Sequence, residues 1–339
     1  MLKKDSIEAK RLERLIGHRL GPYMSHNPVS AVQIWQWCSA MGDKNPSYSP
    51  GASQIAPPAM MQMWTMRDIN DCYAPGSTDA PPYQVFETMQ KMGYSSNVAV
   101  SYDISFHRYL REGDRAQHFT SVVGISDKKV TALGEGFFVT ERVEYFTLDE
   151  KLFAEARITY FQYHAAITRA VATEEPTEVQ SERAAAEFLR MKELSSAQVE
   201  VKALEIETLR VGDPLPEVSI PVSHKLIVSG AIATQDFVPV HHNMRAAQAA
   251  GMPDIFMNIL TTSGLSARYL SDWGGPQSRL QKLQFDLKAP NLPGDVMVMK
   301  GEIVAINPQP SGALVTAAFT GENRLGIHTS GSATLALPS

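Results

Sequence analysis

Cysteine is scarce in this chain, since Cys38 and Cys72 are the two thiols among 339 residues. Two thiols are too few for a disulfide scaffold or a cysteine-rich metal site, and their separation matches no zinc motif. Positive charge is not in excess either, because the chain has 31 lysine and arginine residues and 36 aspartate and glutamate residues, which gives a net charge of −5. A chain without a basic surplus is not predicted to bind nucleic acid.

Long hydrophobic runs are also absent from the sequence. No window approaches 18 uninterrupted apolar residues, and residues 1–17 are charged and amphipathic, without the apolar core of a signal peptide. We therefore expect no membrane span, no export and a cytoplasmic location. Hydrophobic residues make up 44% and charged residues 20% of the chain, which is typical of a globular protein of one or two domains.

The sequence does contain an internal repeat. The motif Asp-x-x-Pro-x-(Tyr or His) runs from Asp43 to Tyr48 and again from Asp236 to His241. Each copy is followed by a predicted helix, over 58–70 in the first half and 253–271 in the second, and then by a strand that precedes a Gly-Asp pair. The order of features is the same in both halves, which indicates a duplication.

Strand periodicity supports the duplication. Apolar and polar residues alternate over 282–289, and a shift of 181 residues aligns Tyr102, Ile104 and Phe106 with Leu283, Phe285 and Leu287. Further strands are predicted in both halves, at 118–125, 136–145, 153–163, 296–306, 313–320 and 327–337. Each half therefore reads as an α+β unit with several antiparallel strands.

The predicted organisation is two domains joined by a linker. Residues 1–171 form the N-terminal domain and residues 212–339 the C-terminal domain. The segment between them, 172–211, is rich in Glu, Ala and Ser, with a polar helix predicted at 181–194.

Asp236 and His241 are the candidate catalytic residues. A loop that turns at Pro239 can direct a carboxylate and an imidazole at one small volume, where a bound water would lose a proton to one group and receive one from the other. On spacing alone, a turn aspartate and a surface histidine explain the pair more often than catalysis does. A metal site that also uses the adjacent His242 is a third interpretation.

The segment Asp236-Phe237-Val238-Pro239-Val240-His241 resembles the Asp-x-Asn-Pro-x-His signature of the MaoC-like, (R)-specific enoyl-CoA hydratase 2 family of hot-dog proteins. Val238 stands where that family usually has Asn. The stretch from Ala250 to Leu260 resembles the segment that opens the family's central helix, with Asn258 replacing a His and Ile259 a Gly. The run 136–145 is similar to a dehydratase-like domain that precedes MaoC-like domains.

The resemblance implies a double hot-dog fold, in which each half is a central helix wrapped by an antiparallel sheet. It also implies that the backbone N–H of Ile259 polarises the thioester carbonyl, with Asn258 and Gly251 in the same oxyanion or substrate-binding segment. Asn243 either orients the water or caps a turn. Arg245, Arg268 and Arg279 either hold the CoA phosphates or lie on the surface.

The first half carries a degenerate site in this interpretation. Asp43 and Asn45 match the signature, but Tyr48 stands at the histidine position, and a phenol with a pKa near ~10 is a poor base at neutral pH. We expect a non-catalytic half that makes room for a bulky acyl group, as in the steroid side-chain hydratases of the family.

The expected function is therefore a hydro-lyase that adds water to a 2,3-enoyl-CoA in lipid or steroid catabolism. Coenzyme A would be part of the substrate, and no separate cofactor or metal is expected. The alternatives are a hot-dog acyl-CoA thioesterase and a non-catalytic acyl-CoA-binding subunit of a hydratase complex. We expect a homodimer, and the resemblance leaves open a complex with other side-chain degradation enzymes. The OB-fold extension that some degenerate subunits carry is missing here, which argues against a fixed complex with an aldolase.

Overall fold

The computed structural model describes residues 7–51, 54–165, 204 and 206–338. The chain divides into two compact units, which are described separately: unit 1 is residues 1–30 with 61–169, and unit 2 is residues 31–60 with 170–339. This division differs from the predicted domains, chiefly because 31–60 groups with the second half of the chain. Most of the predicted linker, and the whole helix predicted at 181–194, lie outside the described residues.

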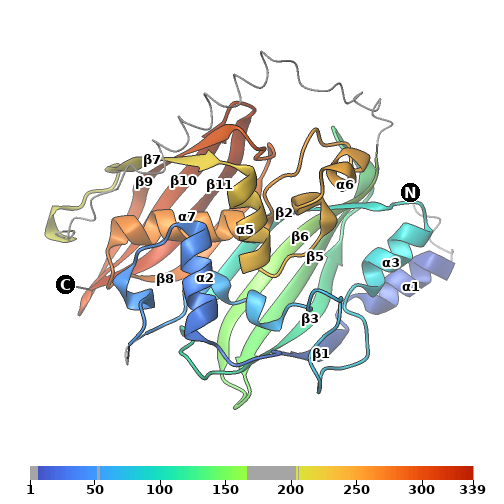
Figure 1. Ribbon diagram of the computed structural model, residues 1–339, viewed down its shortest axis with the longest axis horizontal. Coiled ribbons are helices and arrows are strands. Elements are labelled where there is room, and N and C mark those ends of the chain that lie inside the picture. The colour runs from blue at the N-terminus through green and yellow to red at the C-terminus, as the bar shows by residue number, and fades with distance from the viewer. Residues whose placement is uncertain (1–6, 52–53, 166–203, 205, 339) are drawn as a thin grey trace. The chain divides into compact units, whose positions relative to one another are not determined.

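Unit 1 is built on one antiparallel sheet. Its strands lie in the order β1-β3-β5-β6-β2, with the short β4 paired to β5. The helices α1 and α3 pack against each other in the same unit (Figure 1). The bounds of its elements are α1 (Ile7–Leu15), β1 (Arg19–Met24), η3 (Met63–Thr65), α3 (Gln84–Lys91), β2 (Ser96–Phe106), β3 (Ala116–Ile125), β4 (Lys129–Thr131), β5 (Gly134–Thr147) and β6 (Leu152–Ala165).

Unit 2 contains a second antiparallel sheet, in the order β8-β11-β10-β9-β7. Helix α7 lies against β7, β8 and β11, and α2 and α5 pack on α7 and on each other (Figure 1). The bounds are α2 (Ala31–Met41), η1 (Pro46–Tyr48), η2 (Pro58–Met60), η4 (Ile206–Thr208), β7 (Pro214–Val222), α5 (His224–Ala233), η5 (Pro239–His241), α6 (Met244–Ala249), α7 (Ile259–Gly274), β8 (Arg279–Leu287), β9 (Asp295–Gln309), β10 (Gly312–Asn323) and β11 (Gly326–Pro338).

The central helix α7 is buried along most of its length, which explains its small residues. A Cβ added at Gly264 would lie 2.9 Å from Cζ2 of Trp37, a residue of α2. A Cβ at Gly230 of α5 would lie 2.3 Å from the Oγ1 of Thr261 in α7. The helices therefore approach closely only because these positions lack side chains.

The predicted strands are present in both units, and their alternation places the expected residues inside. Tyr102, Ile104 and Leu283 are each at most 1% exposed. The helix predicted at 253–271 exists but begins at Ile259.

The helix predicted at 58–70 is wrong. Two short 3-10 turns, η2 and η3, occupy part of it instead. Met66 already has an extended backbone, with φ −69° and ψ 159°, and its N–H closes the η3 turn on the Met63 carbonyl. Among the described residues, no helix is long and apolar enough to cross a membrane.

Candidate active site

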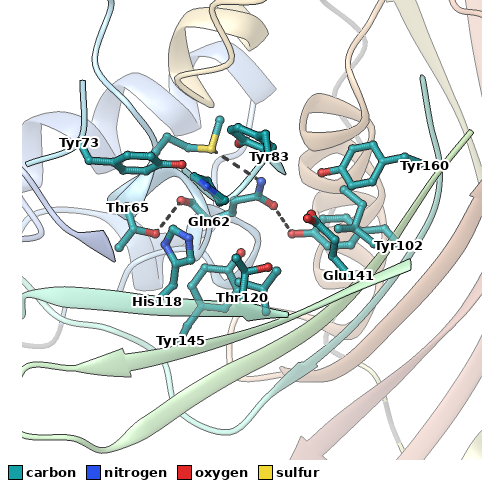
Figure 2. Close-up of a pocket in the computed structure, with 14 residues that line it drawn as sticks. Gln62, Thr65, Tyr73, Tyr83, Tyr102, His118, Thr120, Glu141, Tyr145 and Tyr160 are labelled. Atoms are coloured by element: carbon teal, nitrogen blue, oxygen red, sulfur yellow. Dashed lines mark hydrogen bonds between the residues drawn. The ribbon is translucent and has the colours of Figure 1, made fainter. Parts of the chain in front are cut away.

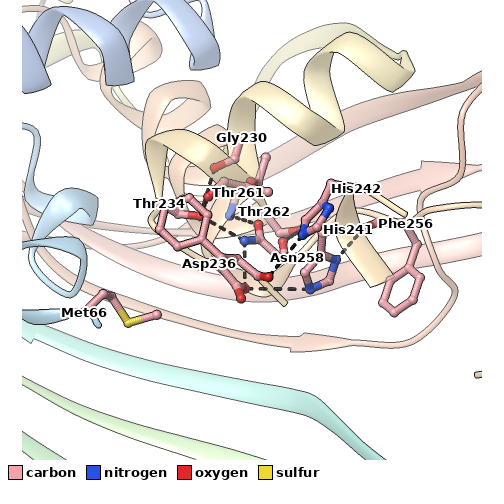
Figure 3. A network of polar contacts seen from close by, with 12 residues as sticks. Met66, Gly230, Thr234, Asp236, His241, His242, Phe256, Asn258, Thr261 and Thr262 are labelled. Atoms are coloured by element: carbon pink, nitrogen blue, oxygen red, sulfur yellow. Dashed lines mark hydrogen bonds and ion pairs between the residues drawn. The ribbon is translucent and has the colours of Figure 1, made fainter. Parts of the chain in front are cut away.

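The Asp236–His241 segment is a tight loop that follows α5. Gln235 takes a left-handed conformation, with φ +55°, which reverses the chain after the helix. The backbone N–H of Asp236 then donates to the Ala231 carbonyl at 2.9 Å. Pro239 starts η5, whose last residue is His241. The loop thus turns both candidate side chains toward each other, as Figure 3 shows.

The imidazole of His241 is held in one tautomer. Its Nδ1 lies 2.7 Å from the Phe256 carbonyl oxygen. Because a carbonyl only accepts hydrogen bonds, Nδ1 carries the proton in the neutral ring and Nε2 presents a lone pair. Nε2 lies 3.7 Å from Asp236 Oδ2, which is longer than a hydrogen bond. Both atoms therefore keep a lone pair for a water molecule bound next to them.

Asn258 fixes the Asp236 carboxylate. Its Nδ2 donates to Asp236 Oδ2 and to Thr234 Oγ1, both at 2.9 Å. Its Oδ1 accepts from the Thr261 backbone N–H at 2.8 Å, so the same side chain is the N-cap of α7. Thr234 in turn donates to the Gly230 carbonyl. The sequence placed Asn258 in the substrate-binding segment, whereas its hydrogen bonds make it an orienting residue for the carboxylate.

The first turn of α7 begins beside this network. Ile259 is the first residue of the helix, and no hydrogen bond among the described residues uses the backbone N–H of Ile259 or Leu260. The N-terminus of a helix carries partial positive charge, which favours a developing negative charge nearby. The Ile259 N–H is therefore a suitable donor to a polarised carbonyl oxygen.

Three other candidates have local roles in the structure. Asn243 caps α6, since its Oδ1 accepts from the Ala246 N–H at 3.3 Å. Gly251 closes the turn after α6, with φ +87°. His242 is exposed and bonded through Nε2 to the Phe237 carbonyl at 3.1 Å, away from Asp236. Among the described residues, no group of three or more His, Cys, Asp or Glu side chains is arranged to hold a metal ion.

The arginines proposed for CoA phosphates differ in their surroundings. Arg268 donates to the Met41 carbonyl at 2.8 Å and pairs with Asp272 at 3.2 Å, so it connects α7 to the end of α2. Arg279 donates to the carbonyls of Pro276 and Ser278. Arg245 is exposed on α6.

Sequence reasoning missed a histidine next to the central helix. His328 of β11 is 2% exposed, and its Nε2 lies 2.9 Å from Thr262 Oγ1. Its Nδ1 lies 2.7 Å from the Ala289 carbonyl, and burial lowers its pKa to about 4. The neutral ring anchors Thr262 one turn after Asn258. One feature of the sequence indicated this residue, namely a histidine on the inward face of a predicted apolar strand.

The two copies of the motif share one backbone conformation. The residue before η1, Asn45, has φ −59° and ψ 120°, and the residue before η5, Val238, has φ −60° and ψ 127°. The Asn45 side chain accepts from the Ser47 N–H at 3.0 Å, so its function is to cap the turn. Val238 makes the same turn without that cap, so the departure from the family signature leaves the loop intact.

In unit 2, Tyr48 is buried and Asp43 is half-buried. Tyr48 is 7% exposed, and Asp43 Oδ1 accepts from the Asn45 N–H at 3.0 Å. Burial raises the pKa of Asp43 to about 6, against the opposing effects of the Asn45 N–H and of Arg268.

Comparisons with known proteins identify relatives of this chain. The family model for the MaoC like domain matches residues 208–318. The chain is 39% identical over 127 residues to the 3-oxo-4,17-pregnadiene-20-carboxyl-CoA hydratase beta subunit of Mycobacterium tuberculosis, covering 38% of this chain and 95% of that protein. It is 36% identical over 140 residues to a probable enoyl-CoA hydratase alpha subunit of Thermomonospora curvata, covering 39% of this chain and 44% of that protein.

A solved structure described as a MaoC-like dehydratase shares the fold along almost the whole chain. Its TM-score is 0.68 at 18% identity, covering 97% of this chain and all of that one. The α+β, double hot-dog class expected from the sequence is thereby confirmed.

Proposed function

The chain belongs to the MaoC-like family, and on that premise we propose that it adds water reversibly across the 2,3-double bond of an enoyl-CoA thioester. The observation that carries the proposal is the pairing of Asp236 Oδ2 with the unprotonated Nε2 of His241 at 3.7 Å. Two relatives of the chain are named as hydratase subunits, which supports the proposal.

The reaction follows from the tautomer of His241. Its Nε2 accepts a proton from the bound water as the water oxygen bonds to C3 of the enoyl group. The Asp236 carboxylate holds the water and stabilises the imidazolium. The imidazolium then returns a proton to C2 on the same face, which restores the neutral ring and gives the 3-hydroxyacyl thioester. Run backward, the same steps dehydrate that product.

The negative charge that develops on the thioester carbonyl oxygen is stabilised by a fixed dipole. As hydroxide adds to C3, electron density moves to the carbonyl oxygen, and a preorganised donor at that position lowers the barrier. We assign that donor to the Ile259 N–H at the start of α7, which no described group satisfies.

The proposal extends to the acyl group of the substrate and to the oligomeric state of the protein. A relative named for a pregnadiene-carboxyl-CoA supports a bulky, steroid-type acyl group for this chain. Relatives named as alpha and beta subunits support an oligomer, and we propose a homodimer that works in the cytoplasm alongside other side-chain degradation enzymes. Coenzyme A enters as part of the substrate, with no separate cofactor.

The test mixes the purified chain with crotonyl-CoA and, separately, with a sterol-derived enoyl-CoA. Enoyl absorbance and free thiol are followed together. Loss of enoyl absorbance without thiol release supports a hydratase, and a preference for the sterol-derived substrate supports the bulky acyl group. Release of free CoA would instead identify a thioesterase, and no reaction with either substrate would identify an acyl-CoA-binding subunit.

A further inference from the structure

Unit 1 contains a polar cavity that the proposed hydration does not use. It lies between the 3-10 turn η3 and the strands β2, β3, β5 and β6, and it encloses about 40 Å³ (Figure 2). At ~10–15 Å³ for each water-sized group, this space admits about three waters or the end of one ligand. Its lining includes Glu141, His118, Thr120 and Gln62 together with five tyrosines.

Glu141 is the least expected of these residues. The residue is 4% exposed, and no hydrogen bond or ion pair among the described residues involves its carboxyl group. Burial raises its pKa to about 8, so the carboxyl group is largely protonated at neutral pH and can donate a hydrogen bond. A buried carboxyl group without a protein partner lowers stability unless a molecule in the cavity forms a hydrogen bond with it.

Two polar atoms elsewhere in the lining are buried and have no hydrogen-bond partner among the described residues. They are Thr120 Oγ1 and His118 Nδ1, both on β3. Burial lowers the pKa of His118 to about 3, which keeps its ring neutral. In contrast, Tyr102 is satisfied, because its hydroxyl donates to Gln62 Oε1. Besides Glu141, two polar atoms of this lining thus have no hydrogen-bond partner among the described residues.

The lining has no cationic side chain and, with Glu141 protonated, no formal charge. A charged ligand would have no counter-charge to replace its lost hydration. A neutral oxygen fits better, since a carbonyl accepts from the carboxylic acid and a hydroxyl both accepts and donates. Apolar residues, among them Val143 and Ile158, complete the wall and suit a hydrocarbon body.

We propose that the cavity of unit 1 binds the carbonyl or hydroxyl oxygen of a neutral, mainly hydrocarbon ligand, with Glu141 as the principal hydrogen-bond donor. The ligand is either the far end of the acyl group, which rests on the proposed function, or a separate neutral molecule.

The first experiment measures binding without turnover. Testosterone, a neutral 3-oxo-4-ene steroid, is titrated into the full chain by equilibrium dialysis, and androst-4-en-17β-ol, which lacks the 3-oxo group, is the matched ligand. We expect testosterone to bind at least 10-fold more tightly. We also expect its enone absorption band to shift to longer wavelength on binding, since a hydrogen bond to the 3-oxo oxygen lowers the energy of the enone transition.

Variants of Glu141 identify the donor. Glu141→Gln keeps a neutral donor of the same shape and should retain affinity within about threefold, whereas Glu141→Leu should weaken testosterone at least 10-fold and abolish the band shift. Glu135→Gln is the control on the same strand, because that side chain is 46% exposed and pairs with Lys128. Thermal unfolding of each variant confirms that it is folded.

The second experiment distinguishes the two sources of the ligand. The value of kcat/KM is measured for enoyl-CoA substrates whose acyl groups carry or lack a ring ketone. A loss in Glu141→Leu confined to the ketone substrate identifies the acyl group as the ligand, and binding of testosterone without such a loss identifies a separate molecule. Equal affinity for the two steroids, or a Glu141→Leu variant that binds testosterone normally, overturns the proposal. A chain that binds testosterone but hydrates nothing refutes only the hydratase function.

Discussion

Replacing Asn258 separates the two roles that the structure gives this side chain. Its Oδ1 caps α7, and its Nδ2 supports the Asp236 carboxylate. Asn258→Ser keeps a capping oxygen and loses the amide donor, whereas Asn258→Ala loses both. A cap contributes about 1 kcal/mol, and a hydrogen bond to a charged group about 1.5–3 kcal/mol. We therefore expect Asn258→Ala to be about 1 kcal/mol less stable than Asn258→Ser.

The activity of the two variants should fall by a similar amount, because both release the carboxylate. If this hydrogen bond stabilises the transition state by its full energy of about 1.5–3 kcal/mol, its loss corresponds to a ~10–150-fold drop in kcat. Urea unfolding gives the stabilities, and turnover of an enoyl-CoA by the folded variants gives kcat. Ser223→Ala is the matched control, since Ser223 caps α5 through the Leu226 N–H and touches no catalytic group. Wild-type kcat in Asn258→Ser would refute the positioning role.

Three further predictions concern stability, packing and the degenerate site. The pKa of Glu141 rises from 4.5 to about 8 on folding. Its contribution to the free energy of unfolding is therefore fully present below pH 4.5 and is lost as pH rises toward 8. The unfolding free energy of Glu141→Gln should therefore fall less steeply with pH over that range than that of the wild type, by up to about 1.4 kcal/mol per pH unit. Urea unfolding at several pH values measures this difference. Gly264→Ala should lower stability by about 1–3 kcal/mol in the same assay, because its Cβ would lie 2.9 Å from Trp37 and 3.0 Å from Met41 Sδ, and an unchanged midpoint would contradict the packing of α7. Tyr48→Phe should leave turnover of crotonyl-CoA within a few fold, and a collapse would show that the first motif is catalytic.

The sequence was most informative where local periodicity and turn chemistry act alone. Alternation placed Tyr102 and Leu283 on the inner faces of their strands. The two Pro-containing turns were aligned correctly, because Pro fixes φ and both copies adopt the same backbone before the turn. The pairing of Asp236 with His241 followed from that turn.

Long-range packing accounts for what was missed. The segment predicted as a helix at 58–70 forms only short 3-10 turns, and its backbone is already extended at Met66. The grouping of residues 31–60 with unit 2 depends on α2 packing against α5 and α7, which no local pattern records. Likewise, the bond from Asn258 to Asp236 spans 22 residues, and the polar cavity around Glu141 is assembled from four strands and a turn.

The central claim is that Asp236 and His241 together activate water. It is tested most directly by kcat/KM for an enoyl-CoA in His241→Ala and Asp236→Asn, with His242→Ala as the matched control, because His242 is adjacent yet bonded away from Asp236. General acid–base catalysis contributes about 10²–10⁴-fold, so the account predicts losses of at least ~100-fold in the first two variants and near wild-type activity in the third. Unchanged activity in both His241→Ala and Asp236→Asn would contradict it.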